Sequence, residues 1–433
     1  TSELTLPEIF TAQNSRFGMA AYGKWHLGGT ANAPSVRGGW PEFAGIRRGG
    51  VTNYTLWDKL ENGTTTEDVT SYTTTDQVNE GTDFIVSKGT NPWFLWMAFN
   101  APHTPFHSPP SNLAPVGGYS TSGSSNSDQY IRALEALDTE IGRLLTVVDL
   151  NRTNVIVIGD NGTPGQVVQA PFGNGHAKGD LYQGGIHVPL FAVGPDIRIT
   201  GTTDKLVHCV DLVSTILDLG GIDGNAATAG FSTHSQSLLP IFHGTDTASR
   251  CVIAEKFGDN NGNGRALISD VYPDYKLIIF GDKDDISDTP IFELYNLPSD
   301  ANEQTNLLLS PLSNEAQSAY DHLLAKDLAL GGGYSDSPAG SFDTIYIELP
   351  NRTGPTSPPN NLSVNPTAII IDGQSASFVA REDSSGTAQR YWVKCSLTPG
   401  TGGPFTSATV TFPNNPNTGG ARSFNSTQII ANP

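Results

Sequence analysis

The stretch NPWFLWMAFN at residues 91–100 decides the fold, because it is strand-sized and apolar at nearly every position. A strand with one face in water alternates apolar and polar residues, whereas a strand buried on both faces does not. Strands of that second kind belong to sheets that are covered by helices on both sides. Residues 91–100 therefore predict an α/β domain in which helices sandwich a sheet.

Helical and strand patterns alternate around this stretch over the first three-quarters of the chain, as expected of such a sheet. Helices are predicted over residues 6–13, with Pro7 in the first turn, and over 73–89, 127–149 and 205–222. The helix at 127–149 has apolar side chains at helical spacing, and the helix at 205–222 is closed by glycine. Strands are predicted over residues 16–23, 153–162 and 187–195, the last two buried like 91–100.

The character of the sequence changes near residue 250, where short strands recur at regular spacing and predict an antiparallel sheet. A helix follows, and then Gly/Pro/Ser-rich stretches that are typical of linkers. The tail is strand-rich and is a candidate carbohydrate-binding or surface-attachment unit. The predicted parts are an α/β core at 1–248, an antiparallel sheet with a helix at 249–333, a linker at 334–365 and an accessory β unit at 366–433.

The composition of the chain limits the classes of partner that the protein can bind. The formal net charge is −19, from 24 basic and 43 acidic residues. Such a charge argues against nucleic acid and anionic membrane surfaces as partners. No apolar run approaches the ~20 residues that span a bilayer. Low lysine content and abundant Thr, Ser, Asn and Gly favour a secreted or periplasmic protein. The 3 cysteines are far apart and form no C-x-x-C pair, which argues against a cysteine metal cluster.

Polar groups follow four of the predicted strands or lead into the next one. They are Lys24 and His26 in GKWH, His103 and His107 in APHTPFH, Asp160 and Asn161 in GDNG, and His176 and Lys178 in GHAKGDLYQGG. Each motif alone is most often an ordinary loop or turn. The carboxyl ends of strands are where functional groups gather in α/β sheets, so the four together favour one site.

The residue types at these ends suit an anionic ligand beside a metal. In an extended segment Lys24 and His26 project to the same side, while Trp25 packs on the other. A lysine gives a fixed positive charge and a histidine can give or take a proton. The oxygens of Asp160 and Asn161 are hard ligands suited to Ca²⁺ or Mg²⁺.

The order of these motifs resembles the sulfatase family, within the alkaline-phosphatase-like superfamily. The resemblance rests on GKWHLG, APHTP, DNG and KGDLYQGGIHVPL, supported by GGWPEFAG and by later segments such as FELYNLPSDANEQTNLL. It covers roughly residues 1–330. It implies a mixed, mostly parallel sheet sandwiched by helices, a small C-terminal antiparallel sheet, and hydrolysis of a sulfated small molecule or glycan.

The resemblance also implies roles for single residues. Asp160 and Asn161 would ligate a divalent cation, Ca²⁺ rather than Mg²⁺. Lys24 and Lys178 would bind the sulfate oxygens and balance developing charge. His103 would protonate the leaving-group oxygen as general acid, and His26 would assist the nucleophile and the release of sulfate.

Two features of the family are not found in these 433 residues. One is a strand with paired aspartates that complete the metal site; the other is a C-x-P/A-x-R segment whose Cys becomes the nucleophile formylglycine. Without that segment the chain is expected to be inactive. Gln183 stands where the family usually has Glu, and His187 stands where Arg is common.

Three explanations stay open. The segment is missing from the sequence, is a separate polypeptide after cleavage, or was lost in a non-catalytic binder of sulfated glycans. The first is favoured, because a binder would have little reason to keep all six site residues. Within enzymes, the alternative is a phosphoesterase or phosphonate hydrolase on the same scaffold. One further motif, DNNGNG at 259–264, fits half of an EF-hand calcium loop, but its flanks predict strands and favour a hairpin loop.

Overall fold

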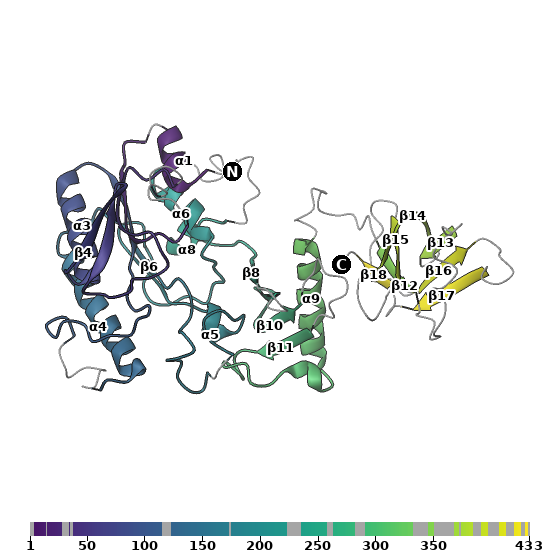
Figure 1. Cartoon of the computed structure of the whole chain (residues 1–433). Helices are drawn as coiled ribbons and strands as arrows, with labels where there is room; N and C mark the ends of the chain where they lie inside the picture. Colours follow the sequence, from purple (N-terminus) through teal and green to yellow (C-terminus); the bar gives the residue numbers. More distant parts are fainter. Residues whose placement is uncertain are drawn as a thin grey trace. The chain divides into compact units, whose positions relative to one another are not determined.

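The structure is a computed structural model with two compact units, Thr1–Arg250 and Cys251–Pro433 (Figure 1). It describes residues 4–13, 15–27, 34, 38–114, 123–172, 175–222, 235–257, 263–281 and 291–331, and the strands of the tail. In this part of the chain, no helix is long and apolar enough to cross a membrane.

A mixed five-stranded sheet forms the centre of the first unit, as predicted. Its strands are β1 (Gly18–Lys24), β2 (Glu42–Ile46), β3 (Trp57–Glu61), β4 (Thr64–Val69) and β5 (Trp93–Ala98), in the order β4-β3-β2-β1-β5. β1 pairs in parallel with both β2 and β5, whereas the β2–β3 and β3–β4 pairs are antiparallel. The carboxyl ends of β1, β2 and β5 therefore meet at one edge of the sheet.

Helices cover both faces of this sheet. On one face lie α3 (Thr73–Lys88) and α4 (Asn126–Leu145), whose Val78, Phe84 and Leu144 pack with Ala20 and Tyr22 of β1. On the other face lie α1 (Leu6–Ala12) and α6 (Asp211–Leu219). The side chains of β1 alternate between these two cores, which is the two-sided burial that an apolar strand predicts.

The strands predicted at 153–162 and 187–195 do not join the large sheet. They form a separate antiparallel ribbon of β6 (Val155–Ile158) and β7 (Leu190–Val193). One face of the ribbon packs on α6 and α8 (Leu239–Phe242), but the other leaves Phe191 67% exposed. The prediction that these strands are fully buried is wrong, because no described strand or helix covers that face.

The same holds for β5, the stretch that predicted the fold. Its side chains are mostly half-buried, and Trp96 is 41% exposed. β5 lies at the end of the sheet, so only one of its edges pairs with a described strand. The strand exists where the sequence predicts it, but burial on both faces is incomplete.

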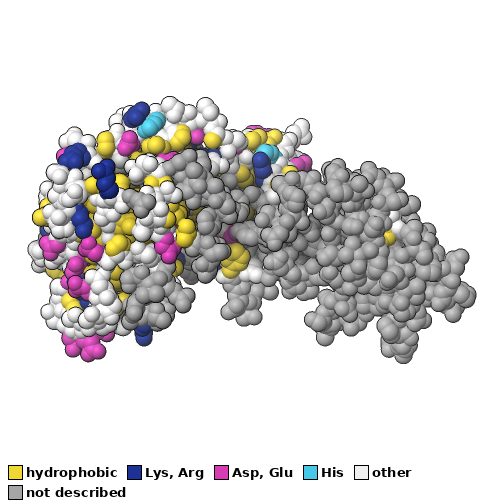
Figure 2. Space-filling view, turned by 90° about the horizontal axis from the view of Figure 1, so that it is seen from above, with side chains coloured by type: hydrophobic (Ala, Val, Ile, Leu, Met, Phe, Trp, Pro, Cys, Tyr) yellow, Lys and Arg dark blue, Asp and Glu magenta, His cyan; other side chains and the backbone are white. Residues whose placement is uncertain are grey.

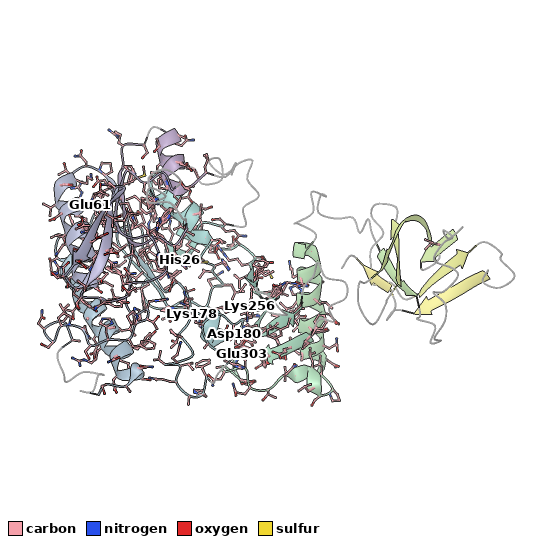
Figure 3. The ribbon with its side chains drawn as sticks, viewed as in Figure 1. His26, Glu61, Lys178, Asp180, Lys256 and Glu303 are labelled. Carbon is pink, nitrogen blue, oxygen red and sulfur yellow. The ribbon has the colours of Figure 1, made fainter. Side chains whose placement is uncertain are left out.

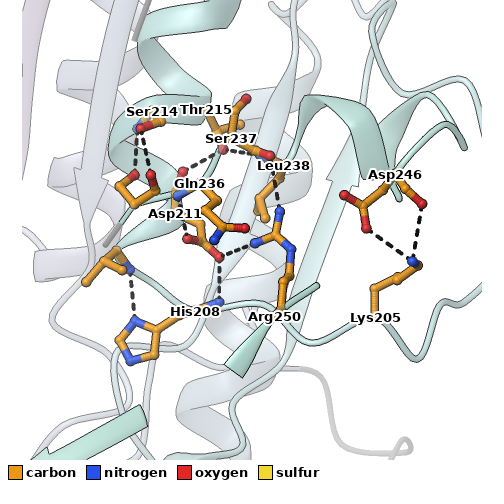
Figure 4. Close-up of polar contacts among 12 residues, drawn as sticks. Lys205, His208, Asp211, Ser214, Thr215, Gln236, Ser237, Leu238, Asp246 and Arg250 are labelled. Carbon is orange, nitrogen blue, oxygen red and sulfur yellow. Dashed lines mark hydrogen bonds and ion pairs between the residues drawn. The ribbon is translucent and has the colours of Figure 1, made fainter. Parts of the chain in front are cut away.

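A buried polar network fixes the end of the first unit to α6 (Figure 4). The Asp211 carboxylate accepts hydrogen bonds from the backbone N–H groups of His208 and Gln236, both at 2.9 Å, and from the Arg250 guanidinium at 3.0 Å. The Thr215 hydroxyl accepts a hydrogen bond from the Leu238 N–H at 2.8 Å. The predicted helix at 205–222 thus begins only at Asp211, whose side chain holds the preceding backbone.

The second unit begins with a four-stranded antiparallel sheet, as predicted. Its order is β11-β10-β9-β8, and α9 (Asn314–Gly331) packs on it. The strands are β8 (Cys251–Lys256), β9 (Gly264–Ser269), β10 (Tyr272–Phe280) and β11 (Ile291–Asn296), with a short 3₁₀ turn at Leu307–Leu309. β8 and β9 pair as a hairpin around the DNNGNG motif, and residues 258–262 of its loop lie outside the described residues.

The tail forms a seven-stranded antiparallel sheet in the order β17-β16-β13-β14-β15-β12-β18. Its strands are β12 (Ile345–Leu349), β13 (Ala368–Ile371), β14 (Gln374–Asp383), β15 (Tyr391–Ser396), β16 (Ser407–Phe412), β17 (Gly420–Asn425) and β18 (Ile429–Ala431). β12 lies inside the stretch predicted as a linker, because its alternating IYIEL sequence pairs with β15 and β18.

Candidate active site

Three of the predicted site residues gather at the carboxyl edge of the five-stranded sheet. Gly23 of β1 is in register with Ala98 of β5, so Lys24 and the turn that carries His103 follow the same edge. His103 closes that turn by donating its N–H to the Asn100 carbonyl at 2.9 Å. His26 follows two residues after the end of β1 and is labelled in Figure 3.

The backbone at His26 differs from the extended geometry predicted for GKWH. β1 ends at Lys24, and His26 has φ 54, a left-handed conformation that few residues other than glycine adopt. Its N–H donates to the Arg47 carbonyl at 3.0 Å, which ties it to the segment after β2. Trp25 packs against Phe43, as the sequence predicts. Strained backbone of this kind clusters at functional sites.

Two consecutive glycines lie directly against the two histidines. A Cβ added to Gly49 would be 2.6 Å from Cε1 of His26, and one added to Gly50 would be 3.0 Å from Nδ1 of His103. Real Cβ atoms essentially never come as close as the distance at Gly49, and the distance at Gly50 is tighter than nine in ten real contacts. The two glycines therefore leave the space in which the imidazoles lie. The segment after β2 is therefore shared by His26 and His103, which come from different strands.

A buried aromatic cluster supports the same loop. The Tyr54 hydroxyl lies 2.8 Å from the Asn100 carbonyl oxygen and 2.7 Å from the His103 carbonyl oxygen. The ring of His107 stacks on Tyr54 with the centroids 3.9 Å apart. The Tyr72 hydroxyl contacts Nε2 of His107 at 2.9 Å.

His107 has a structural role in this cluster. Its Nδ1 lies 3.0 Å from the Pro105 carbonyl oxygen, which can only accept, so Nδ1 carries the proton. Nε2 then accepts from the Tyr72 hydroxyl, and both ring nitrogens are satisfied. Burial lowers the pKa of His107, which keeps the ring neutral.

The other three predicted site residues form a second group, on the loop after β6 and the segment before α5 (Gln183–Ile186). The Lys178 N–H donates to the Thr163 carbonyl at 2.9 Å, and the Gly162 N–H donates to the Gly185 carbonyl at 2.9 Å. These bonds hold the loop of Asp160 and Asn161 against Lys178, which Figure 3 labels with Asp180. His176 stacks on Tyr182 at 3.7 Å between centroids.

The structure thus brings the six residues together in two groups of three. No hydrogen bond or ion pair among described residues links Lys24, His26 or His103 to Asp160, Asn161 or Lys178. Lys24 and Lys178 are half-buried, and neither forms an ion pair with a described carboxylate. In a protein with net charge −19, two cations without carboxylate partners favour binding of an anion.

Comparison with known families identifies the family of the chain. The family model described as "Sulfatase" matches residues 1–222, about half of the chain and all six site residues. The chain belongs to the sulfatase family. The resemblance carried by GKWH, APHTP, DNG and KGDLYQGG is therefore confirmed at the level of the family.

Similar sulfatases come from distant organisms. The chain is 27% identical over 255 residues to the uncharacterized sulfatase YdeN of Escherichia coli K12, covering 51% of this chain and 44% of that protein. It is 29% identical over 208 residues to human N-acetylglucosamine-6-sulfatase, covering 40% of this chain and 36% of that protein. The chain thus spans less than half the length of these curated relatives.

Solved structures show the same fold at low identity. Ps i-CgsB in complex with k-i-k-neocarrahexaose has a TM-score of 0.59 at 19% identity, over 76% of this chain and 73% of that one. BT4656 in complex with D-glucosamine-2-N,6-O-disulfate has a TM-score of 0.59 at 17% identity, over 78% of this chain and 83% of that one. These likenesses confirm the predicted α/β architecture of the sulfatase.

The donor set for a metal is incomplete in the described part of this sulfatase. Asp160 and Asn161 provide hard oxygen ligands, but Ca²⁺ takes six to eight oxygens. No group of three or more His, Cys, Asp or Glu side chains among the described residues is arranged to hold a metal ion. The two residues fit a hard cation in type, and an ion bound by them would need further ligands.

Sequence reasoning missed the residues that support the histidines. Gly49, Gly50 and Tyr54 follow β2, which carries none of the four motifs, and they act through contacts that are distant in sequence. The one available signal was the pair of glycines that follows Arg47 and Arg48 after the end of β2, since glycine permits close backbone approach.

Proposed function

We propose that this protein hydrolyses sulfate esters. One observation carries the proposal. In this member of the sulfatase family, His26 and His103 lie against the adjacent glycines Gly49 and Gly50, at the sheet edge that also carries Lys24. The proposed substrate is a sulfated small molecule or glycan. Two proteins of similar fold were solved in complex with k-i-k-neocarrahexaose and with D-glucosamine-2-N,6-O-disulfate, and these ligands support the proposal. The acidic composition favours a secreted or periplasmic location.

Each residue takes the role that its chemistry permits. Lys24 and Lys178 bind sulfate oxygens and stabilise the charge that develops as the ester bond breaks. His103 donates a proton to the departing alcohol oxygen, and His26 assists the nucleophile and the release of sulfate. Asp160 and Asn161 would hold Ca²⁺, with Mg²⁺ as the less suitable ion. That ion would supply further positive charge beside the sulfate.

The nucleophile, formylglycine, and the remaining metal ligands are proposed to come from a segment outside these 433 residues. The described sheet has room for one more strand, because the all-apolar β5 pairs on one edge alone and Trp96 is exposed. The ribbon β6–β7 likewise leaves Val157 39% exposed and Val193 47% exposed. A strand that paired in parallel with β5 would fill this open edge and end at the edge where Lys24 and His103 lie.

The handedness of the fold supports this placement. α3 connects β4 to the parallel strand β5 and lies on one face of the sheet, whereas α1 precedes β1 and lies on the other face. Consider a parallel strand beyond β5 that is connected through α1 to β1. This connection would cross the sheet from the β5 side towards β1, opposite in sense to the β4-to-β5 connection, and it would lie on the opposite face. Its crossover would therefore have the same hand as that of α3, the right-handed one that such connections adopt.

Steady-state turnover of 4-nitrophenyl sulfate and 4-nitrophenyl phosphate tests the proposal, in protein that carries the nucleophile segment. We expect sulfate to be the better substrate, and activity to be lost in Lys24→Ala. Faster turnover of the phosphate would instead identify a phosphoesterase. Binding of sulfated oligosaccharides without turnover would identify a non-catalytic binder.

A further inference from the structure

We propose that Tyr54 is a positioning residue for His103, and that its hydroxyl sets the efficiency with which the leaving group is protonated. The inference rests on the proposed function, because it concerns the general acid of that reaction. It extends that function to a residue outside the four motifs, in the segment that also contacts His26.

The first step is the geometry of the His103 turn. Tyr54 is 2% exposed, and its single hydroxyl proton is shared between the carbonyl oxygens of Asn100 and His103. The Asn100 oxygen also accepts the His103 N–H. The turn is therefore held by its own backbone hydrogen bond and by the Tyr54 hydroxyl. The His103 oxygen is fixed by the tyrosine, and the backbone that carries the imidazole is held at both ends of the turn.

The second step is the rigidity of Tyr54 itself. The Tyr54 carbonyl accepts the Thr73 N–H and the Thr73 hydroxyl, both at 2.9 Å. The Tyr54 ring is covered by His107, whose two nitrogens are both bonded. The hydroxyl therefore cannot move away from the His103 turn without disturbing α3 or the stack.

The segment after β2 also limits the space around the His103 imidazole, through Gly50. Gly50 leaves only enough space for the ring, since an added Cβ would lie 3.0 Å from Nδ1. Nδ1 also lies 2.9 Å from the Thr104 carbonyl oxygen, so Nδ1 carries a proton that this oxygen accepts. The proton given to the leaving oxygen is therefore the second proton of the imidazolium ring, carried on Nε2, which returns to the neutral acceptor form after the transfer. Tyr54 and Gly50 thus fix the direction in which Nε2 of His103 points.

A kinetic signature follows from this arrangement. General acid catalysis contributes about 10²–10⁴-fold, and only where the leaving oxygen needs a proton. A sugar or alkyl alcohol is a poor leaving group and needs one, whereas 4-nitrophenolate leaves as an anion. A displaced His103 should therefore slow sugar sulfates and leave aryl sulfates nearly unchanged.

The experiment compares Tyr54→Phe with Tyr72→Phe in protein that carries the nucleophile segment. Tyr72 is the matched control, because it is a buried hydroxyl of the same cluster that contacts His107 and not the His103 turn. We expect Tyr54→Phe to lower kcat for a sugar sulfate by roughly 10- to 100-fold and for 4-nitrophenyl sulfate by less than about 3-fold, with KM unchanged. Tyr72→Phe should change both substrates by the same small factor.

Gly50→Ala provides a second route to the same answer if Tyr54→Phe does not fold. It displaces His103 from the opposite side and should show the same selectivity between the substrates. Gly142→Ala is its control, because no atom lies within 4 Å of the added Cβ. Equal losses with both substrates in Tyr54→Phe and in Gly50→Ala would overturn the proposal.

A measurement without turnover separates this inference from the proposed function. In ¹³C-histidine-labelled protein, the ring signal of His103 should shift in Tyr54→Phe and stay in place in Tyr72→Phe. If wild type hydrolyses no sulfate ester, the proposed function fails, yet the signal still reports whether Tyr54 positions His103. An unchanged His103 signal in Tyr54→Phe would overturn the positioning role on its own.

Discussion

Charged side chains are handled in opposite ways in two regions of this protein. In the second unit, Lys276 and Glu303 are fully buried and form an ion pair at 2.6 Å. At the edge of the sheet in the first unit, Lys24 and Lys178 are half-buried and form no ion pair with a described carboxylate. The comparison teaches that the chain neutralises charge where it supports packing, and leaves positive charge unbalanced where an anion is expected to bind.

The largest effect should come from breaking the buried pair. Lys276→Ala would remove the cation that pairs with the buried Glu303 carboxylate, at a cost of about 3–5 kcal/mol in the free energy of unfolding of the second unit. Urea denaturation measures this cost. The double variant Lys276→Met with Glu303→Met is the control and should regain most of the loss, since no charge stays buried. A loss below ~1 kcal/mol in the single variant would mean that the pair is hydrated.

At the sheet edge, replacing a lysine is expected to lower activity and to leave stability nearly unchanged. Lys24→Ala and Lys178→Ala should each lower kcat/KM for a sulfate ester by about 10²–10³-fold, because each removes a cation that stabilises the transition state. Their free energies of unfolding should change by less than ~1 kcal/mol, since no described partner is left unpaired. Lys88→Ala and Lys205→Ala would not serve as controls, because Lys88 pairs with Glu42 at 2.8 Å and Lys205 pairs with Asp246 at 3.1 Å. Arg152→Ala is the control, because Arg152 is exposed and forms no ion pair with a described carboxylate.

A smaller loss of stability is expected from overpacking the space beside His26 at the sheet edge. Gly49→Ala places a Cβ 2.6 Å from the His26 ring and is expected to cost about 1–3 kcal/mol through overpacking. Activity should fall as well, because the imidazole is displaced. Thermal unfolding and turnover should be measured together. Normal activity in this variant would show that His26 does not need its observed position.

The smallest effect concerns pH. Burial lowers the pKa of His107 in the folded protein, whereas an unfolded histidine titrates near ~6.5. As the pH falls below ~6.5, the unfolded chain binds a proton that the folded protein resists, so the free energy of unfolding declines by at most ~1.4 kcal/mol per pH unit. The decline stops once His107 itself is protonated. His107→Phe should flatten this dependence, and exposed His187→Gln should not.

Much of the fold was predictable because its signals are local. The apolar run of β5, the helical spacing in α4 and the short strands near Cys251 each indicate their own element. Burial of β5 and of the ribbon β6–β7 was predicted wrongly, since burial depends on a neighbour that the local sequence does not contain. The linker prediction overlooked β12, whose pairing with β15 is more than forty residues away in sequence.

The site was predictable as a set of motifs and unpredictable as a geometry. The order of GKWH, APHTP, DNG and KGDLYQGG identifies the family, which the comparison confirms. The roles of the six residues stay predictions. The left-handed backbone of His26 and the support from Tyr54 depend on contacts between segments, which no motif spacing encodes. His107 illustrates the limit, because it lies four residues after His103 in the same APHTPFH motif while its own contacts are structural.

The buried guanidinium of Arg250 has a practical consequence for dissecting this protein. Arg250 is the last residue of the first unit, and its side chain is 6% exposed and bonded to Asp211. A protease that cleaves after arginine must bind that side chain in its own pocket. The boundary between the units should therefore resist trypsin, although boundaries of this kind are usual sites of cleavage. A fragment of the first unit should therefore be ended genetically, after Arg250 and not before it.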